Sequence, residues 1–298
     1  MDDPDIQRLI GDAPHIRLEE IVPHPRFEEA RRLYLKRFLE VYGGDPFLVR
    51  LLIESGRFIV FVLAIILDAG QEPDKRETWF TIGRLKQLMT SFGLASDRQV
   101  DHLVARLREV GFLDSLPAPQ DGRVRILKPT QRMLAHDRDW LAAHYAPLTI
   151  LCPQNDYSAV LKRDPAFQLA QRRAAIPFMA LGYKLLMSVP DMTLFFDKAA
   201  GHMVLAALLQ TALDSPDHQR HTAVPYADVG ERFGVSRTHV RQLLAAAEDR
   251  GLVKLRARGG HSVEILPRLW ASHARGIAGG MYLHDLIHAV GTNRRPAV

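Results

Sequence analysis

The sequence predicts a mainly α-helical protein with two small β-hairpins, built from two similar halves related by a pseudo-two-fold axis. Three observations predict this fold class. Helical hydrophobic periodicity dominates the 298 residues. Two segments alternate like the strands of short hairpins. One pattern of serine, valine, leucine and glycine occurs twice, about 140 residues apart.

The stretch from Val229 to Leu244 predicts two short helices around a sharp turn. Gly234 can adopt the positive φ that ends the first helix, and the Ser236 hydroxyl can cap the second. The second helix then buries a stripe of residues at helical spacing: Val240, Leu243, Leu244 and Ala247. Its remaining polar residues are expected to face outward as donors for base edges and phosphates: Arg237, Thr238, His239, Arg241 and Gln242.

A predicted hairpin follows this pair of helices. Residues 252–256 and 262–266 alternate like strands, and residues 257–261 form a glycine-rich tip. The combination resembles a winged helix-turn-helix, the fold of many bacterial transcription regulators, including the MarR-like family. The resemblance implies that the wing, near 252–266, contacts the DNA backbone or the minor groove. By position this role would fall to Arg256, Arg258 and His261.

The first half repeats the pattern. Residues 96–113 align without gaps with residues 236–253, and residues 114–127 supply a matching wing. Asp97 and Asp101 occupy the positions of Arg237 and Arg241, and carboxylates are repelled by phosphates. We therefore expect weaker DNA binding here, and whether this unit contacts DNA stays open. Its candidate contacts are Arg98, Gln99, His102, Arg123 and Arg125.

A tandem duplication divides the chain into domains 1–158 and 159–298, each a helical arm followed by a winged unit. The arms are Arg26–Tyr42 and Pro165–Met187, and the MarR-like resemblance implies that they pack against each other, as the terminal helices do in dimers of that family. The hydrophobic composition is sufficient for each half to bury its own core. Residues 160–298 contain 18 Lys and Arg against 11 Asp and Glu, whereas residues 1–159 contain 21 against 23. The second unit should therefore supply most of the DNA affinity.

The remaining features argue against other classes. Cys152 is the only cysteine, so no intrachain disulfide can form, and we expect it to be buried. Residues 58–67 are too short to cross a bilayer and predict a central helix in a cytoplasmic protein without a membrane partner. His284 and His288 lie one helical turn apart, but no third ligand is evident, so they predict an exposed helix face and not a metal site. No catalytic or phosphate-binding motif supports an enzyme or a cofactor.

The expected function is therefore that of a sequence-specific transcriptional regulator that binds double-stranded DNA. A duplicated chain can imitate a dimer, with two recognition helices in successive major grooves about 34 Å apart. A monomer would then suffice, although a homodimer stays open. The resemblance also implies a small-molecule effector bound between the arms and the winged units. Two alternatives remain: a plasmid-type replication initiator, and a structural adaptor whose tandem winged domains bind protein.

Overall fold

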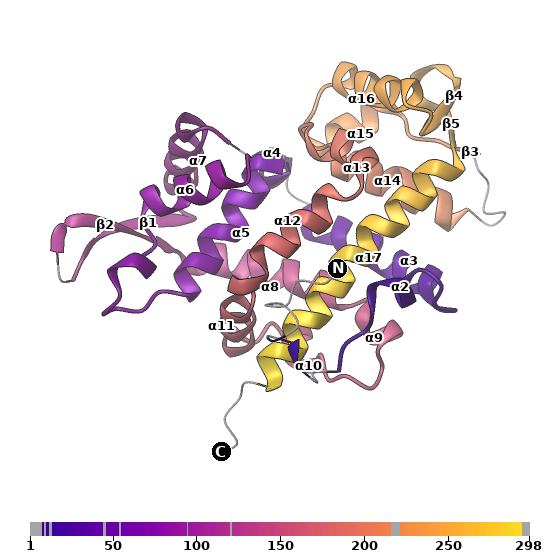
Figure 1. The fold of residues 1–298 in the computed structure, drawn as a ribbon. Coiled ribbons are helices and arrows are strands. Elements are labelled where there is room, and N and C mark those ends of the chain that lie inside the picture. Colours follow the sequence, from indigo (N-terminus) through magenta and orange to yellow (C-terminus); the bar gives the residue numbers. More distant parts are fainter. Residues whose placement is uncertain are drawn as a thin grey trace.

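The computed structural model describes residues 8, 10–11, 14–43, 46–53, 55–93, 95–119, 121–215 and 221–293. The chain is mainly helical, with two small antiparallel sheets (Figure 1). The expectation of a mainly α protein with small β elements is confirmed.

The first half runs from the N-terminal segment to α8 and is followed by two short connecting helices. Its elements are α2 (Leu18–Ile21), α3 (Phe27–Tyr42), α4 (Pro46–Leu52), α5 (Ser55–Ala69), η1 (Arg76–Thr78), α6 (Ile82–Ser91), α7 (Asp97–Glu109), β1 (Leu113–Ala118), β2 (Asp121–Pro129) and α8 (Gln131–Tyr145). The connection contains α9 (Leu148–Leu151) and α10 (Ser158–Leu161). We call α6, α7, β1 and β2 the first unit.

The second half ends in the longest helix described. Its elements are α11 (Pro165–Ala174), η2 (Ile176–Phe178), α12 (Met179–Met187), α13 (Pro190–Phe196), α14 (Gly201–Asp214), β3 (His221–Thr222), α15 (Tyr226–Phe233), α16 (Arg237–Asp249), β4 (Val253–Ala257), η3 (Arg258–Gly260), β5 (Ser262–Ile265) and α17 (Pro267–Asn293). We call β3, α15, α16, β4 and β5 the second unit. Figure 1 shows the two units lying apart, with α12 between them and α17 running diagonally below the second unit.

The same order of elements occurs in both halves. The series α4, α5, α6, α7, β1, β2, α8 corresponds to α13, α14, α15, α16, β4, β5, α17. Helices α7 and α16 begin 140 residues apart, at Asp97 and Arg237, and each is capped by a serine hydroxyl, of Ser96 and Ser236. This order agrees with the internal repeat seen in the sequence.

The two sheets differ by one strand. In the second unit β3 joins the hairpin, so the strand order is β3–β5–β4. In the first unit β1 pairs with β2 alone, from Leu113 opposite Pro129 to Pro117 opposite Arg125. The Leu127 amide, however, donates a hydrogen bond to the Phe80 carbonyl (2.8 Å), so Phe80 lies beside β2 much as β3 lies beside β5.

The arm helices cross to the opposite half. Helix α3 packs against α14 as well as α8, and α11 packs against α5 as well as α17. The reason is the composition of α5 and α14, which are apolar around most of their circumference and need cover on more than one side. The expectation that each half buries its own core is therefore wrong, because the buried apolar side chains form one cluster. The two arms were expected to pair with each other, but their main partners are the core helices.

Buried polar groups reinforce the joint between the halves. The Asp137 carboxylate on α8 pairs with the Arg172 guanidinium on α11, and both side chains are almost fully buried. The buried Asp285 carboxylate on α17 accepts hydrogen bonds from the Ile16 amide (2.7 Å) and the Tyr157 hydroxyl (2.6 Å). The N-terminal segment, the connection and the last helix are thereby tied together.

Candidate nucleic-acid interface

The turn between α15 and α16 has the geometry that its sequence predicts. Gly234 ends α15 in the left-handed conformation (φ 69°), and the Ser236 hydroxyl accepts the His239 amide of α16 (3.0 Å). A side chain at Gly234 would meet Pro46 of α4, so the turn also lies close to the first half. Helix α16 buries the expected stripe of Val240, Leu243, Leu244 and Ala247. This burial fixes which side of α16 faces outward.

The outward side of α16 carries four exposed polar residues near its N-terminus: Arg237, Thr238, Arg241 and Gln242. Within the described ranges, neither arginine forms an ion pair or a hydrogen bond through its guanidinium group. Their spacing of i, i+1, i+4 and i+5 places them on one face. The arrangement offers two unpaired guanidinium groups, a hydroxyl and an amide, which are the donors used in DNA grooves.

His239 differs from the expectation that it faces outward with these residues. Its ring is half-buried, and Nε2 lies 2.8 Å from the Ala199 carbonyl oxygen in the turn between α13 and α14. The following residue, Ala200, has a positive φ of 55°, so this turn is tightly constrained. The imidazole therefore fixes α16 against the helical body, which leaves it poorly placed for a groove contact.

The cationic side chains of the second hairpin differ in whether they are free to contact a binding partner. Arg258 and His261 are exposed at the tip, whereas the Arg256 Nε donates to Glu264 on the paired strand (2.7 Å). This pair lowers the pKa of Glu264 below its usual value through the hydrogen bond. Gly260 (φ 81°) brings the tip so close to Val224 that a Cβ there would lie 2.0 Å from its carbonyl oxygen. The tip is thus held beside the start of α15, and Arg258 is its unpaired cation.

In the first unit, α7 presents a mixed surface. Arg98, Gln99 and His102 are exposed, as are the two aspartates expected at this helix. The Gln99 Oε1 accepts the Ser96 amide (2.8 Å), so this side chain completes the helix cap. The Asp101 carboxylate pairs with Lys86 of α6 (2.8 Å). Part of the polar surface of α7 therefore already has hydrogen-bond or ion-pair partners within the first unit.

Polar groups of the first hairpin also form hydrogen bonds within the unit. Arg123 is exposed next to the tip, and its backbone amide donates to Asp121 (3.1 Å). The Arg125 guanidinium donates to the carbonyl oxygen and to the hydroxyl of Ser115 on the paired strand. Asp121 also lies 3.4 Å from the Arg76 guanidinium. Arg123 is thus the more available of the two expected wing cations.

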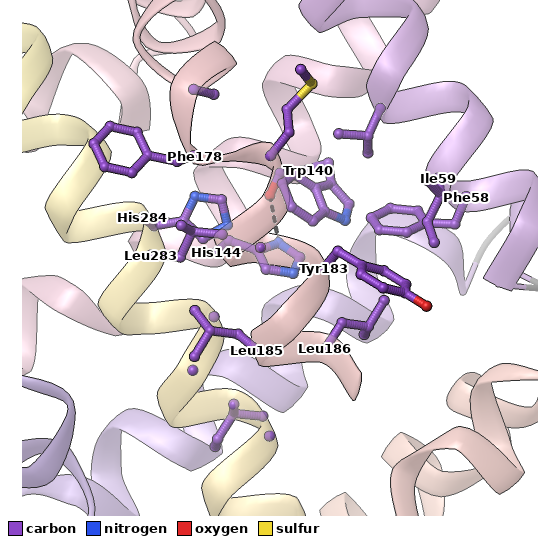
Figure 2. A pocket seen from close by; sticks show the side chains of 18 of the residues that line it. Phe58, Ile59, Trp140, His144, Phe178, Tyr183, Leu185, Leu186, Leu283 and His284 are labelled. Carbon is purple, nitrogen blue, oxygen red and sulfur yellow. Dashed lines mark hydrogen bonds between the residues drawn. The ribbon is translucent and has the colours of Figure 1, made fainter. Parts of the chain in front are cut away.

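A cavity of about 280 Å³ lies between the two halves and is lined by residues of both arms (Figure 2). The resemblance implied a small-molecule site near the arms, but the sequence pattern did not identify the residues of such a site. The wall of the cavity is mainly apolar and comes from α3, α5, α8, α11, α12, α13, α14 and α17. Figure 2 shows Phe58 and Ile59 of α5 facing Trp140 of α8, with His144 and His284 nearby and Tyr183 of α12 alongside. One signal could have indicated it: the glycine-rich centre of α17, at residues 276–280.

The two histidines near the C-terminus of α17 are not on an exposed face. His284 and His288 are 6% and 8% exposed and pack among Tyr145, Tyr157 and Phe167. The expectation of a solvated helix face here is wrong, because α17 is covered by the connection and by α11. Within the described residues no group of three or more His, Cys, Asp or Glu side chains is placed to hold a metal ion. Cys152 is buried, as expected.

Comparisons with protein-family models, with curated proteins and with solved structures found no match to this chain. Among the described helices, none alone is both long and apolar enough to cross a membrane; α13 and α14 pass that test only as a pair bent by 113°. The geometry of the two units and of the cavity is therefore what points to a function.

Proposed function

We propose that the chain is a sequence-specific DNA-binding transcriptional regulator that acts as a single-chain pseudo-dimer. Its two units would be winged helix-turn-helix domains, with α7 and α16 as recognition helices and the two hairpins as wings. The second unit would supply most of the affinity. The observation that carries this proposal is the exposed, unpaired row of donors at the start of α16, from Arg237 to Gln242.

The fold of the second unit supports the proposal. The order α14, β3, α15, α16, β4, β5 places a three-stranded sheet beside the helix pair, as a winged domain requires. The buried stripe and the His239 contact with Ala199 fix α16 in one orientation before any partner binds. A helix that is already held in one orientation loses little backbone entropy on binding.

The shared core supports the pseudo-dimer. Because α3 covers α14 and α11 covers α5, both units are anchored in one cluster of buried side chains. Two recognition helices held in one body suit a DNA site with two half-sites, and the charge difference between α7 and α16 predicts that these half-sites differ. A protein-binding adaptor would gain little from unpaired guanidinium groups at Arg237, Arg241 and Arg258.

The test begins by selecting duplexes from a randomised pool with the purified chain. Replacing Arg237 and Arg241 together by alanine should weaken binding to the selected duplex by at least tenfold, since one bidentate arginine contact contributes about 1–3 kcal/mol. The dependence of affinity on salt should also become shallower. The control with the same charge change replaces Lys162 and Lys184, which are exposed outside both units, and should bind nearly as the unaltered chain does. Equal binding by both double variants would refute the assignment.

A companion experiment addresses the first unit. Replacing Asp97 and Asp101 by alanine should leave the affinity unchanged or raise it, because two carboxylates near the phosphates are removed. A large loss would show instead that these aspartates read bases, for example by accepting from a cytosine amino group.

A further inference from the structure

The centre of α17 is built to leave space beside it. Gly276, Gly279 and Gly280 lie inside this 27-residue helix and line the cavity, although glycine is unfavourable in a helix interior. A Cβ on Gly279 would make only an ordinary contact with Leu185 of α12, so a small side chain would fit there. A Cβ on Gly280 would meet no atom within 4 Å. Position 280 therefore leaves room that a side chain would fill.

Two buried polar side chains of the cavity wall are poorly satisfied. The His284 Nδ1 forms no hydrogen bond within the described structure, and the Gln171 amide interacts with the Tyr145 hydroxyl but forms no hydrogen bond of normal geometry; these residues are only 6% and 3% exposed. Buried polar atoms are nearly always hydrogen-bonded in folded proteins. Their positions on the wall would be explained by a molecule that offers them a hydrogen-bonding group.

Among the described residues of the cavity wall, no charge is left uncompensated. The Arg172 guanidinium at its edge is paired with Asp137. Burial lowers the pKa of His144 to about 3 and the pKa of His284 well below its usual value, so both rings are neutral. An ionic molecule would lose its hydration here without gaining a counter-charge.

We propose that this cavity binds one neutral, mainly apolar molecule per chain, about two aromatic rings in size, whose single hydrogen-bonding group meets His284 and Gln171. The volume sets the size. An apolar cavity of about 150 Å³ holds benzene, and this one measures about 280 Å³. Because α5, α12 and α17 all contribute to the wall, the site needs both halves of the chain.

The cavity also reaches the first unit. The Phe92 ring, at the end of α6, lies 5.1 Å from the Tyr183 ring of α12, and both residues line the cavity. Phe92 precedes the turn that leads into α7. An occupant that moves Tyr183 therefore shifts the α6–α7 turn. On the function proposed above, occupancy changes the affinity for DNA.

Binding is measured by titrating the full chain with 1-naphthylamine, a neutral two-ring probe whose fluorescence emission shifts in apolar surroundings. We expect one probe per chain. 1-Naphthol should displace the probe at about three- to tenfold lower concentration than naphthalene, because one net hydrogen bond increases affinity by about that factor. The anion 1-naphthalenesulfonate should not displace the probe. Equal displacement by all three compounds would overturn the proposed chemistry on the unaltered chain alone.

Variants then locate the site. Gly280→Leu should weaken probe binding at least tenfold, whereas Gly280→Ala, the matched control, should retain it. Replacing His284 and Gln171 together by leucine should remove the advantage of 1-naphthol over naphthalene. Circular dichroism establishes that each variant is folded. Unchanged probe binding by folded Gly280→Leu would place the probe elsewhere and reject the site.

The coupling is tested with the selected DNA duplex and saturating probe. If the probe changes the DNA affinity of the unaltered chain but not that of Tyr183→Leu, the coupling is supported. If the probe leaves the DNA affinity of the unaltered chain unchanged, the coupling is rejected, but the binding of the probe to the cavity is not affected by that result. If no duplex binds the chain under any condition, the proposed function fails, and the fluorescence titration alone decides the cavity.

Discussion

The stability of this protein should fall as the pH decreases, because buried histidines stay neutral in the folded chain. His202 on α14 packs between Phe38 and Phe196, with ring centroids 4.6 and 4.5 Å away, and burial lowers its pKa to about 4. In the unfolded chain the same group has a pKa of about 6.5. Below that value the unfolded state gains a proton that the folded state does not, so stability is lost as the pH falls from about 6.5 toward 4.

The size of the effect follows from the two pKa values. At a pH of about 5.5 the unfolded form has gained roughly 1.4 kcal/mol from protonating His202, while the folded form has gained almost nothing. His144, His273 and His284 act in the same direction, because burial lowers the pKa of each. The free energy of unfolding of a typical domain is about 5–15 kcal/mol, so mild acid should lower the stability of this protein considerably.

The measurement is urea unfolding followed by circular dichroism at about pH 7.5 and about pH 5.5. Between these conditions, His202→Leu should lose about 1.4 kcal/mol less free energy of unfolding than the unaltered chain does. The comparison concerns the change with pH, so any constant effect of the substitution cancels. Identical pH dependence in the two proteins would show that His202 is protonated in the fold, and the reasoning would be refuted.

Three further predictions concern the free energy of unfolding at neutral pH, measured in urea. Asp137→Ala should lower it by about 3–5 kcal/mol, because it leaves the buried Arg172 cation unpaired; a loss below about 1 kcal/mol would contradict this. His273→Leu should raise it by about 1–3 kcal/mol, since both ring nitrogens are buried without partners, and a decrease would indicate that they are satisfied. Gly234→Ala should lower it by at least about 1–2 kcal/mol, because φ is 69° and the new Cβ would lie 3.1 Å from Pro46; an unchanged value would mean that the turn relaxes.

The local geometry of the two units could be predicted from sequence because single residues determine it. Gly234 takes the positive φ and Ser236 the capping role that their types favour, and Gly251 ends α16 with a φ of 67°. The buried stripe of α16 follows from helical spacing alone. Such features depend on neighbours within a few positions along the chain, which the sequence displays directly.

Features that depend on tertiary partners could not be predicted in this way. Nothing near His239 shows that its ring meets Ala199, 40 residues earlier. Likewise, His284 and His288 look like a polar helix face until α11 and the connection cover them. The sequence also did not predict that α3 packs on α14 and α11 on α5. Hydrophobic periodicity shows that α5 and α14 are apolar on all sides, but it does not identify the helices that cover them.

The two halves have the same order of elements but different surface residues, and their common core explains how this difference can arise. Residues 203–209 of α14 are buried throughout, whereas Phe58, Ile59 and Val62 in the corresponding part of α5 are only partly buried and border the cavity. In an assembly of identical chains, any such difference would appear in both copies. In one chain whose arms cross, each half supports the other's core helix while its own surface can change independently. Aspartates on α7, arginines on α16 and a cavity against α5 are differences of this kind. If the proposed function holds, the two halves of its DNA site would be unequal for the same architectural reason that creates the cavity.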